Sequence, residues 1–357
     1  MRKGYFSKNI TDWYRDHHRD LPWRNTPDPY KIWLSEIILQ QTRVVQGLPY
    51  YQRFIQNFPT IKSLAEAKEQ AVLRLWQGLG YYTRARNLHK CAREVVKKFN
   101  GKFPHSCEEL KQLPGIGDYT AAAIASFAFQ EPVAVIDGNV YRVLSRIFGI
   151  DKNIASSEGK KFFSELANKL IDVDSPGQHN QAIMEFGALH CLPQNPKCEE
   201  CTFSRSCFAF QHGHQGYLPV KISKPKAIKR HFTYFVIRRG EKILLNKRIS
   251  KDIWKGLFDF PLEEENNHME PNRIVKKNFP HLSLKIPQSS IHTSREYRHV
   301  LSHQIILARF LLIDWPVKKE LPSSPLFRKT RWFSLRQIGN LPKPVLITRY
   351  LDDRGIL

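Results

Sequence analysis

Acidic residues are scarce in this sequence, and the shortage restricts the kinds of partner that the protein can have. Asp and Glu together number 33 against 56 Lys and Arg, which leaves a formal net charge of +23 and a pI near 9.8. This excess favours a polyanionic partner, because Lys and Arg that neutralise phosphates release condensed counterions. A basic bias that serves solubility and an anionic membrane surface are the two alternatives.

The sequence also lacks the apolar segments that direct a chain into a membrane. No apolar run follows Met1-Arg2-Lys3, and no basic amphipathic helix of the membrane-surface kind stands out. Secretion and membrane insertion are therefore not expected. We expect a cytoplasmic protein, associated with the nucleoid if the source is bacterial.

Cysteine is sparse, and most of it is gathered in one place. Four of the six cysteines fall within 17 residues as C-x6-C-x2-C-x5-C, which indicates metal ligation in a reducing compartment and argues against a disulfide framework. Four thiolates suit a cubane iron–sulfur cluster or a tetrahedral zinc, and the spacing alone leaves both open. The two outlying cysteines are expected to be structural. The predicted metal ligands are Cys191, Cys198, Cys201 and Cys207.

The length and the hydrophobic pattern predict two domains. A chain of 357 residues that is 41% hydrophobic exceeds the roughly 250 residues at which single cores stop growing. Residues 1–210 have helical periodicity throughout, including an apolar helix at 29–45, and predict an all-α domain. Residues 211–230 are rich in Pro, Gly and Lys and predict a linker. Residues 231–357 contain alternating runs, such as 257–262 and 303–315, that predict an α+β domain.

A glycine-rich hairpin runs into an Ala-rich helix at residues 113–130, reading LPGIGDYTAAAIASFAFQ. Gly115 and Gly117 permit turn geometries that are closed to residues with a side chain. The free N–H groups and positive dipole end of the following helix then make a seat for one phosphate. With a preceding helix at 106–112 this predicts a helix-hairpin-helix. An ordinary helix-turn-helix corner is the alternative.

Two carboxylates stand in unusual surroundings. Asp137 ends an apolar stretch twenty residues after the hairpin, where the alternative to a functional role is an N-cap for the helix at 139–148. Glu36 interrupts the most apolar part of the helix at 29–45, so its pKa is expected to rise toward the range of a general acid. The alternative for Glu36 is an ion pair with Arg24 or Arg43.

At this point the residues resemble a known family. Residues 1–210 are similar to the helix-hairpin-helix DNA glycosylases, and among them to the adenine DNA glycosylases of the MutY type. The matching motifs, in order, are LPWR (21–24), WLSEIILQQTRV (33–44), GLGYYTRARNL (78–88), LPGIGDYTA (113–121), VIDGNVYRVLSR (135–146), NQAIMEFGA (180–188) and the four cysteines.

The resemblance distinguishes this chain from the endonuclease III branch of the same superfamily. That branch carries a lysine where Tyr119 stands here, and the lysine forms the Schiff base needed for strand cleavage. It also carries a different aspartate motif in place of Asp137-Gly138-Asn139. The resemblance therefore implies an enzyme that hydrolyses the N-glycosidic bond of adenine mispaired with 8-oxoguanine or guanine, without strong lyase activity.

The resemblance also implies a role for each site residue. Glu36 would protonate a ring nitrogen of a flipped-out adenine, and Asp137 would stabilise the positive sugar that remains. Asn139 and Tyr119 would position Asp137 and the sugar, and the four cysteines would hold one 4Fe–4S cluster. Predicted contacts to the substrate and to DNA are Trp23, Arg24 and Glu185 in the adenine pocket, Gln41, Thr42, Leu79 and Tyr81 near the partner base, and Gly115 and Gly117 in the hairpin.

The C-terminal domain resembles the Nudix-like domain of the same glycosylases through WKGLFDFPLEEE and RHVLSH (298–303). No R-E-x-x-E-E run follows the glutamates at 263–265, so binding without hydrolysis is expected. In the family a Phe-Ser-His loop reads 8-oxoguanine. Here Leu301, Ser302 and His303 occupy that loop, so its aromatic wedge is missing. The alternative for His303 is a strand-edge residue with no ligand.

Three functions compete at this stage. The first is the monofunctional adenine glycosylase, which we expect to act as a monomer on double-stranded DNA containing adenine:8-oxoguanine or adenine:guanine mispairs. The second is a bifunctional glycosylase-lyase of the endonuclease III kind. The third is a non-catalytic iron–sulfur DNA-binding protein, in which the carboxylates are structural.

Overall fold

The structure, a computed structural model, describes residues 3–221, 227–250, 252–267, 270–279, 291–301, 303–317, 320–322 and 324–357. It divides into two compact units. The first is Met1–Glu66 with Asn87–Ser223, and the second is Ala67–Arg86 with Lys224–Leu357. Residues 67–86 fall in the expected helical domain but are grouped with the C-terminal part, and the predicted domain boundaries stay a prediction. No described helix is both long and apolar enough to cross a membrane.

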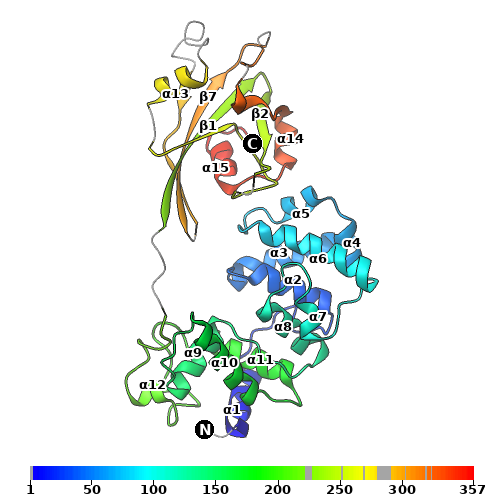
Figure 1. Cartoon of the computed structure of the whole chain (residues 1–357), viewed down its shortest axis with the longest axis vertical. Coiled ribbons are helices and arrows are strands. Elements are labelled where there is room, and N and C mark those ends of the chain that lie inside the picture. Colours follow the sequence, from blue (N-terminus) through cyan, green and yellow to red (C-terminus); the bar gives the residue numbers. More distant parts are fainter. Residues whose placement is uncertain are drawn as a thin grey trace. The chain divides into compact units, whose positions relative to one another are not determined.

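The first unit is helical, as predicted (Figure 1). Its helices are α1 (Lys3–His17), α2 (Pro29–Leu39), α3 (Val44–Asn57), α4 (Ile61–Glu66), most of α6 (Thr83–Phe99), α7 (Cys107–Leu110), α8 (Asp118–Phe129), α9 (Gly138–Phe148), α10 (Ser157–Leu170), α11 (Pro176–Leu189) and α12 (Phe208–Gln211). The helix expected at 29–45 is in fact two helices. Its path breaks after Leu39, where Gln41 has φ 56°, a left-handed conformation that an α-helix cannot contain.

Helix α11 is central to the packing of the first unit. It contacts α1, α8 and α9, while α2 packs against α8 and α3. Val143 and Leu144 of α9 and Phe186 of α11 are fully or almost fully buried in one core cluster together with Phe163 of α10. Burial of each such side chain contributes roughly 1.5–3 kcal/mol. This core fixes α1, α9, α10 and α11 relative to one another, and α2 is joined to them through α8, which packs against both α2 and α11.

The second unit contains α5 (Glu69–Leu75) and a mixed sheet with helices, which agrees with the predicted α+β class. The strands are β1 (Ile228–Arg239), β2 (Lys242–Lys247), β3 (Phe258–Asp259), β4 (Leu262–Glu265), β5 (Ile291–Thr293), β6 (Tyr297–Val300), β7 (Gln304–Asp314) and β8 (Thr330–Ser334). The helices are α13 (Pro271–Asn278), α14 (Leu335–Asn340), α15 (Val345–Asp353) and a 3-10 turn at Pro325–Phe327. β1 pairs with β7 in parallel, and the other pairs among the described strands are antiparallel.

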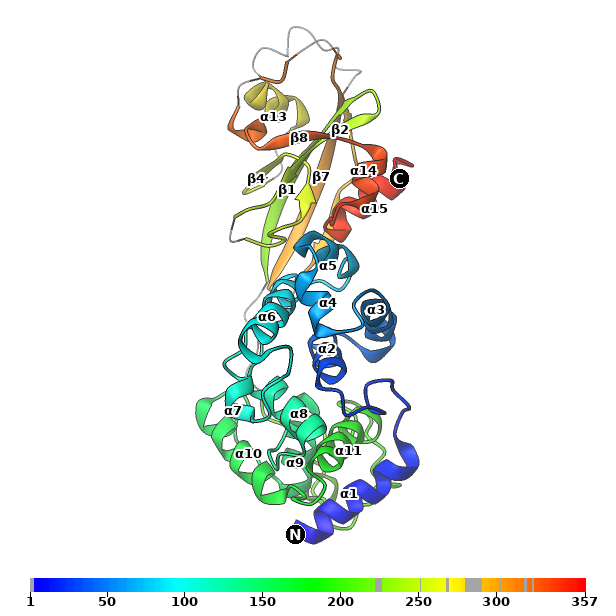
Figure 2. The ribbon, with the colours of Figure 1, turned by 90° about the vertical axis from the view of Figure 1, so that its right-hand side faces the viewer.

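The two faces of the sheet are covered by different helices (Figure 2). Phe235 of β1 packs with Phe279, which follows α13, in one core cluster. The neighbouring Tyr234 stacks on Phe310 of β7, which stacks on Tyr350 of α15 with ring centroids 4.0 Å apart. Because successive side chains of a strand point to opposite faces, α13 and α15 lie on opposite sides of the sheet.

Candidate active site

A pocket of about 530 Å³ lies in the first unit, among α2, α8, α9 and α11. This volume is in the range of small-molecule sites. Eight of the predicted site residues line it, although the sequence places them as much as 162 residues apart. These are Trp23, Arg24, Glu36, Thr42, Tyr119, Asp137, Asn139 and Glu185.

Glu36 lies on α2 with its side chain buried at the pocket wall. Tyr119 of α8 donates a hydrogen bond from its hydroxyl to Oε2 of Glu36 over 2.7 Å. Burial raises the pKa of Glu36 to about 7, with a further rise from the charge of Asp137, while the Tyr119 hydrogen bond and the charge of Arg24 oppose the rise. The expected elevation of this pKa agrees with these surroundings, and no ion pair joins Glu36 to Arg24 or Arg43 among the described contacts.

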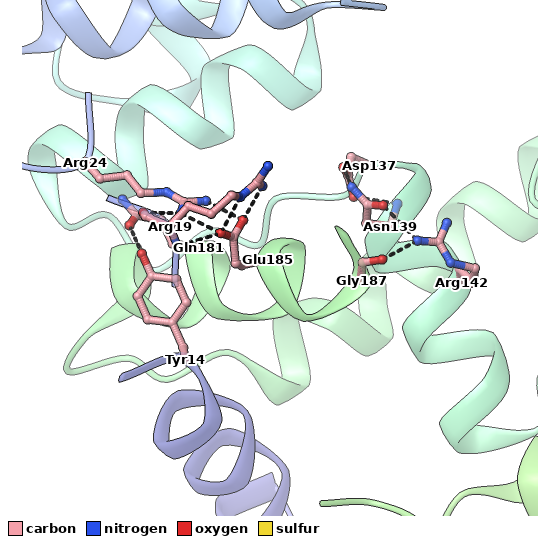
Figure 3. Close-up of polar contacts among 9 residues, drawn as sticks. All are labelled: Tyr14, Arg19, Arg24, Asp137, Asn139, Arg142, Gln181, Glu185 and Gly187. Atoms are coloured by element: carbon pink, nitrogen blue, oxygen red, sulfur yellow. Dashed lines mark hydrogen bonds and ion pairs between the residues drawn. The ribbon is translucent and has the colours of Figure 1, made fainter. Parts of the chain in front are cut away.

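Asp137 is both the N-cap of α9 and a wall of the pocket. Its Oδ1 accepts from the backbone N–H groups of Asn139 and Val140, each over 2.8 Å, and its Oδ2 accepts from Nδ2 of Asn139 over 2.7 Å. Burial raises the pKa of Asp137, whereas these three hydrogen bonds oppose the rise by favouring the ionised form. The capping alternative is therefore confirmed, and it holds the carboxylate facing the pocket (Figure 3).

Glu185 of α11 is not in the apolar setting that its sequence neighbours suggest. Arg19 and Arg24 each reach both of its carboxylate oxygens, over 2.6–2.9 Å. Burial alone would raise the pKa of Glu185, but hydrogen bonds from the two guanidinium groups lower it to about 2. Figure 3 shows both arginines converging on this carboxylate. Glu185 is therefore a fixed anion that orients Arg24 along the pocket wall.

The pocket thus holds carboxylates in contrasting environments. Burial raises the pKa of Glu36 to about 7, whereas hydrogen bonds from two arginines lower the pKa of Glu185 to about 2. Separation of neighbouring pKa values in this way assigns an acid role to one group and an anionic role to another. Glu36 can donate a proton to a molecule in the pocket, and the Asp137 carboxylate can stabilise positive charge that develops on that molecule.

Three residues of the site have no counterpart in the sequence prediction. Arg19 pairs with Glu185, and Gln181 lines the pocket while accepting a hydrogen bond from the Tyr14 hydroxyl over 2.8 Å. Arg142 donates to Oδ1 of Asn139 over 2.8 Å and to the carbonyl of Gly187 over 2.6 Å. The sequence could have predicted the contact of Arg142 with Asn139, because the two residues are three positions apart and therefore lie on the same face of α9.

The remaining predicted DNA contacts lie outside this pocket. Gln41 is exposed at the turn after α2, and Gly115 and Gly117 are exposed in the hairpin, where Gly115 has φ +79°. Tyr81 is 45% exposed, but Leu79 is only 6% exposed. In the second unit Leu301 is half-buried and His303 is exposed. Ser302 lies outside the described residues.

The four clustered cysteines line one small cavity beside α9 and α11. None of the six cysteines is in a disulfide. Nη1 of Arg146 lies 3.5 Å from Sγ of Cys191, and the backbone N–H of Phe203 donates to Sγ of Cys201 over 3.4 Å, so each of these two sulfurs has an N–H donor beside it. The residues that surround the cavity therefore fit a thiolate-bound metal group. In the described ranges no three His, Cys, Asp or Glu side chains already stand at metal-binding positions.

The three glutamates at 263–265 in the second unit each contact other side chains. Glu263 contacts Lys277 and Asn278, Glu264 pairs with Arg230, and Glu265 accepts from Thr233. The expectation that this part of the chain binds without hydrolysis stays a prediction.

Comparison with known proteins extends over both units. Residues 34–169 match the family of HhH-GPD superfamily base excision DNA repair proteins, and residues 233–353 match the NUDIX domain. The adenine DNA glycosylase of Buchnera aphidicola subsp. Baizongia pistaciae is 37% identical over 350 residues, covering 95% of this chain and 94% of the relative. The rat adenine DNA glycosylase is 33% identical, covering 94% of this chain and 75% of the relative.

This chain belongs to the adenine DNA glycosylase family. The glycosylase is a base excision repair enzyme that hydrolyses N-glycosyl bonds, so the non-catalytic alternative is wrong. Its helical part is similar to the structure of a thermostable thymine-DNA glycosylase, with a TM-score of 0.55 at 30% identity over 59% of this chain and 97% of that one. An endonuclease III–DNA complex, with a TM-score of 0.51 at 21% identity over 60% of this chain and 99% of that one, shares the fold.

Proposed function

We propose that this glycosylase removes adenine that is mispaired with 8-oxoguanine or guanine in double-stranded DNA, by hydrolysis and without strand cleavage. The observation that carries this proposal is the meeting of Glu36 and Asp137 at one pocket, with the pKa of Glu36 raised to about 7. The adenine must leave the base stack to reach these groups, because they lie in a concave site rather than on a surface.

The proposed reaction uses the two carboxylates in different protonation states. Glu36 donates its proton to a ring nitrogen of adenine, and the electron pair of the breaking N-glycosidic bond moves to the base. The sugar is left with positive charge, which the Asp137 carboxylate stabilises until water adds to the anomeric carbon and gives its proton to the Glu36 carboxylate, which restores the acid. Asn139 holds Asp137 through its side-chain amide, and Arg142 in turn holds Asn139.

The absence of lyase chemistry is supported by Tyr119. A phenol cannot form the Schiff base that β-elimination requires, and among the described residues no lysine lines the pocket. Instead the hydroxyl of Tyr119 is committed to Glu36. We therefore assign Tyr119 to the control of the Glu36 proton.

Recognition of the base opposite adenine is assigned to residues outside the pocket. We propose that Gln41, Thr42, Leu79 and Tyr81 contact the duplex near that base, that Gly115 and Gly117 bind a backbone phosphate, and that Leu301, Ser302 and His303 read the oxidised guanine. The exposure of Tyr81, Gln41 and His303 supports these roles. Leu79 is only 6% exposed, so its burial gives no support to its part in this assignment.

We also propose that Cys191, Cys198, Cys201 and Cys207 hold one 4Fe–4S cluster. Their common cavity and the nearby donors Arg146 and Phe203 support this assignment. The cluster would fasten the segment after α11, and Arg142 ties that segment to Asn139 because its Nε donates to the carbonyl of Cys191 over 2.8 Å. Brown protein with about four iron atoms per chain is expected, and colourless protein with stoichiometric zinc would contradict the assignment.

One assay tests the function. A duplex with adenine opposite 8-oxoguanine is incubated with the protein, and strand scission is compared with and without alkali. Breaks that need alkali indicate base removal alone, as proposed. Breaks that form without alkali would establish the bifunctional alternative, and intact strands in both samples would remove the proposed substrate.

A further inference from the structure

A loop that carries Tyr81 is fastened on both sides to a single residue of the C-terminal part of the chain. We call residues 77–82 the tyrosine loop. They belong to the second compact unit, together with Lys343 and α15. Helix α5, which leads into this loop and is labelled in Figure 2, belongs to the same unit as α15.

The first fastening point precedes the loop's glycines. Oε1 of Gln77 accepts from the backbone N–H of Lys343 over 3.1 Å, and Nε2 of Gln77 donates to Oγ1 of Thr348 on α15 over 3.0 Å. Both ends of one side-chain amide are therefore engaged by the C-terminal segment. A side chain held at donor and acceptor together has little rotational freedom, so the backbone of Gln77 is held as well.

The second fastening point follows the glycines. Tyr82 is 5% exposed, and its hydroxyl donates to the backbone carbonyl of Lys343 over 3.4 Å. Gln77 and Tyr82 thus contact the N–H and the C=O of the same residue. Tyr81 lies between these two residues, and 45% of its surface is exposed to solvent.

Lys343 is itself held rigidly. It lies between Pro342 and Pro344, which restrict the backbone, and its own side chain is 2% exposed. The buried ammonium group donates to the carbonyls of Ile338 and Leu341 at the end of α14. Lys343, to which the loop is attached, is therefore part of the core of the second unit.

The loop is also stiff within itself. Nε1 of Trp76 donates to the carbonyl of Gly80 over 3.0 Å, and Arg84 donates to the carbonyls of Leu79 and Gly80 over 3.2 and 3.4 Å. Gly78 and Gly80 have φ of +105° and +73°, and Tyr81 itself has φ of +47°. A tyrosine in this left-handed conformation is uncommon and persists only where its surroundings impose it. Displacement of the fastening points would therefore move Tyr81.

We propose that Gln77 is a positioning residue. Together with Tyr82 it attaches the tyrosine loop to residues 341–344, and this attachment holds Tyr81 in the position from which it contacts DNA. The inference rests on the proposed function, in which Tyr81 contacts the duplex near the base opposite adenine. The C-terminal part of the chain then acts on mispair recognition in two ways, through its own loop at 301–303 and through the tyrosine loop.

The test uses the full chain and the Gln77→Met variant, which keeps the length of the side chain but removes the hydrogen bonds to Lys343 and Thr348, together with the exposed one from Arg74. Thr348→Val removes the hydroxyl that accepts from Gln77 and donates to the carbonyl of Pro344, and it leaves the hydrogen bond between Gln77 and Lys343 in place. Gln52→Met, at an exposed position of α3, is the matched control. Affinity for duplexes with adenine opposite 8-oxoguanine and the single-turnover excision rate across pH are measured for each, alone and combined with Tyr81→Ala.

Gln77→Met is expected to weaken duplex binding about fivefold to tenfold, Thr348→Val by less, and Gln52→Met not at all. The pH profile of excision should keep the shape of the unmodified protein, because Glu36 is untouched. In the Tyr81→Ala background the loss from Gln77→Met should vanish, since Gln77 acts through Tyr81. Wild-type affinity in Gln77→Met, or a loss that multiplies with that of Tyr81→Ala, would overturn the inference. Absence of excision by the unmodified chain would overturn the proposed function instead.

Discussion

The proton of Glu36 is the residue-scale feature on which the proposed chemistry depends. The neighbours of Glu36 on α2, including Trp33, Leu34 and Ile37, are almost fully buried, and burial disfavours the charged form of a carboxylate. The result is a carboxylic acid with a pKa of about 7, which can give up a proton at the pH where adenine must be protonated.

Replacement of Glu36 by glutamine is expected to leave duplex binding intact and to slow excision by roughly 10²–10⁴-fold, the usual contribution of a general acid. Glutamine keeps the shape and the acceptor oxygen for Tyr119 but has no transferable proton. The rate of single-turnover excision checks the expected loss of activity, and affinity in a gel-shift assay checks that duplex binding is unchanged. Glu165→Gln, at an exposed position of α10, is the control. Excision at the wild-type rate in Glu36→Gln would refute the acid role.

The pH dependence of excision follows from the same pKa. The acid is available below its pKa, so the rate is expected to be highest below about pH 7 and to fall as the pH rises through the pKa of Glu36. Tyr119→Phe removes a hydrogen bond that lowers this pKa, so the falling limb should move to higher pH. Rate–pH profiles of the two proteins check the direction. A limb that moves to lower pH would mean that Tyr119 favours the protonated form.

At the scale of elements, the close approach of α9 and α11 holds the reacting groups together. Gly187 of α11 lies directly against Asn139, since a Cβ placed on it would stand 2.6 Å from Cβ and 3.1 Å from Cα of Asn139. No side chain fits there. Arg142 fills the neighbouring space and donates to the carbonyl of Gly187.

Gly187→Ala is accordingly expected to push the first turn of α9, with Asp137 and Asn139, away from the pocket. A displacement near 1 Å costs about 100-fold in rate, whereas overpacking costs stability by only roughly 1–3 kcal/mol. Excision rate and the free energy of unfolding are measured together. Gly4→Ala on α1, where nothing lies within 4 Å of the added Cβ, is the matched control. Loss of stability with an unchanged rate would show that the helices adjust without moving the site.

The elements also show what the sequence can and cannot predict. Apolar neighbours were sufficient to predict the burial of Glu36, and a local cap pattern was sufficient for Asp137, because both depend on residues nearby in the chain. The pairing of Arg19 with Glu185 joins residues 166 positions apart, and no local pattern records it. The parallel pairing of β1 with β7 is non-local in the same way. The predicted strand at 257–262 is divided into β3 and β4 around Phe260 and Pro261, where proline cannot donate to a ladder.

At the scale of the whole molecule, the surplus of 23 positive charges is expected to dominate binding to any duplex. Not every basic residue is available for this purpose. Among the basic residues of α6, Arg84 is engaged with the tyrosine loop, and Arg86 donates to the carbonyl of Lys255. Lys90 and Arg93 are exposed, and their spacing of three residues puts them on one face of the helix.

Affinity for duplex DNA should therefore fall steeply and linearly in a plot of log affinity against log salt, by roughly 10³–10⁵-fold between about 50 and 200 mM if six to ten phosphates are contacted. The double variant Lys90→Ala and Arg93→Ala should reduce the slope by about 2 and weaken binding to all duplexes alike. Lys62→Ala, at an exposed lysine that pairs with Glu66, should change neither. Because phosphate contacts carry no sequence information, the ratio of affinities for adenine:8-oxoguanine and adenine:thymine duplexes should stay constant. A double variant that loses only mispair binding would show instead that this face of α6 reads the lesion.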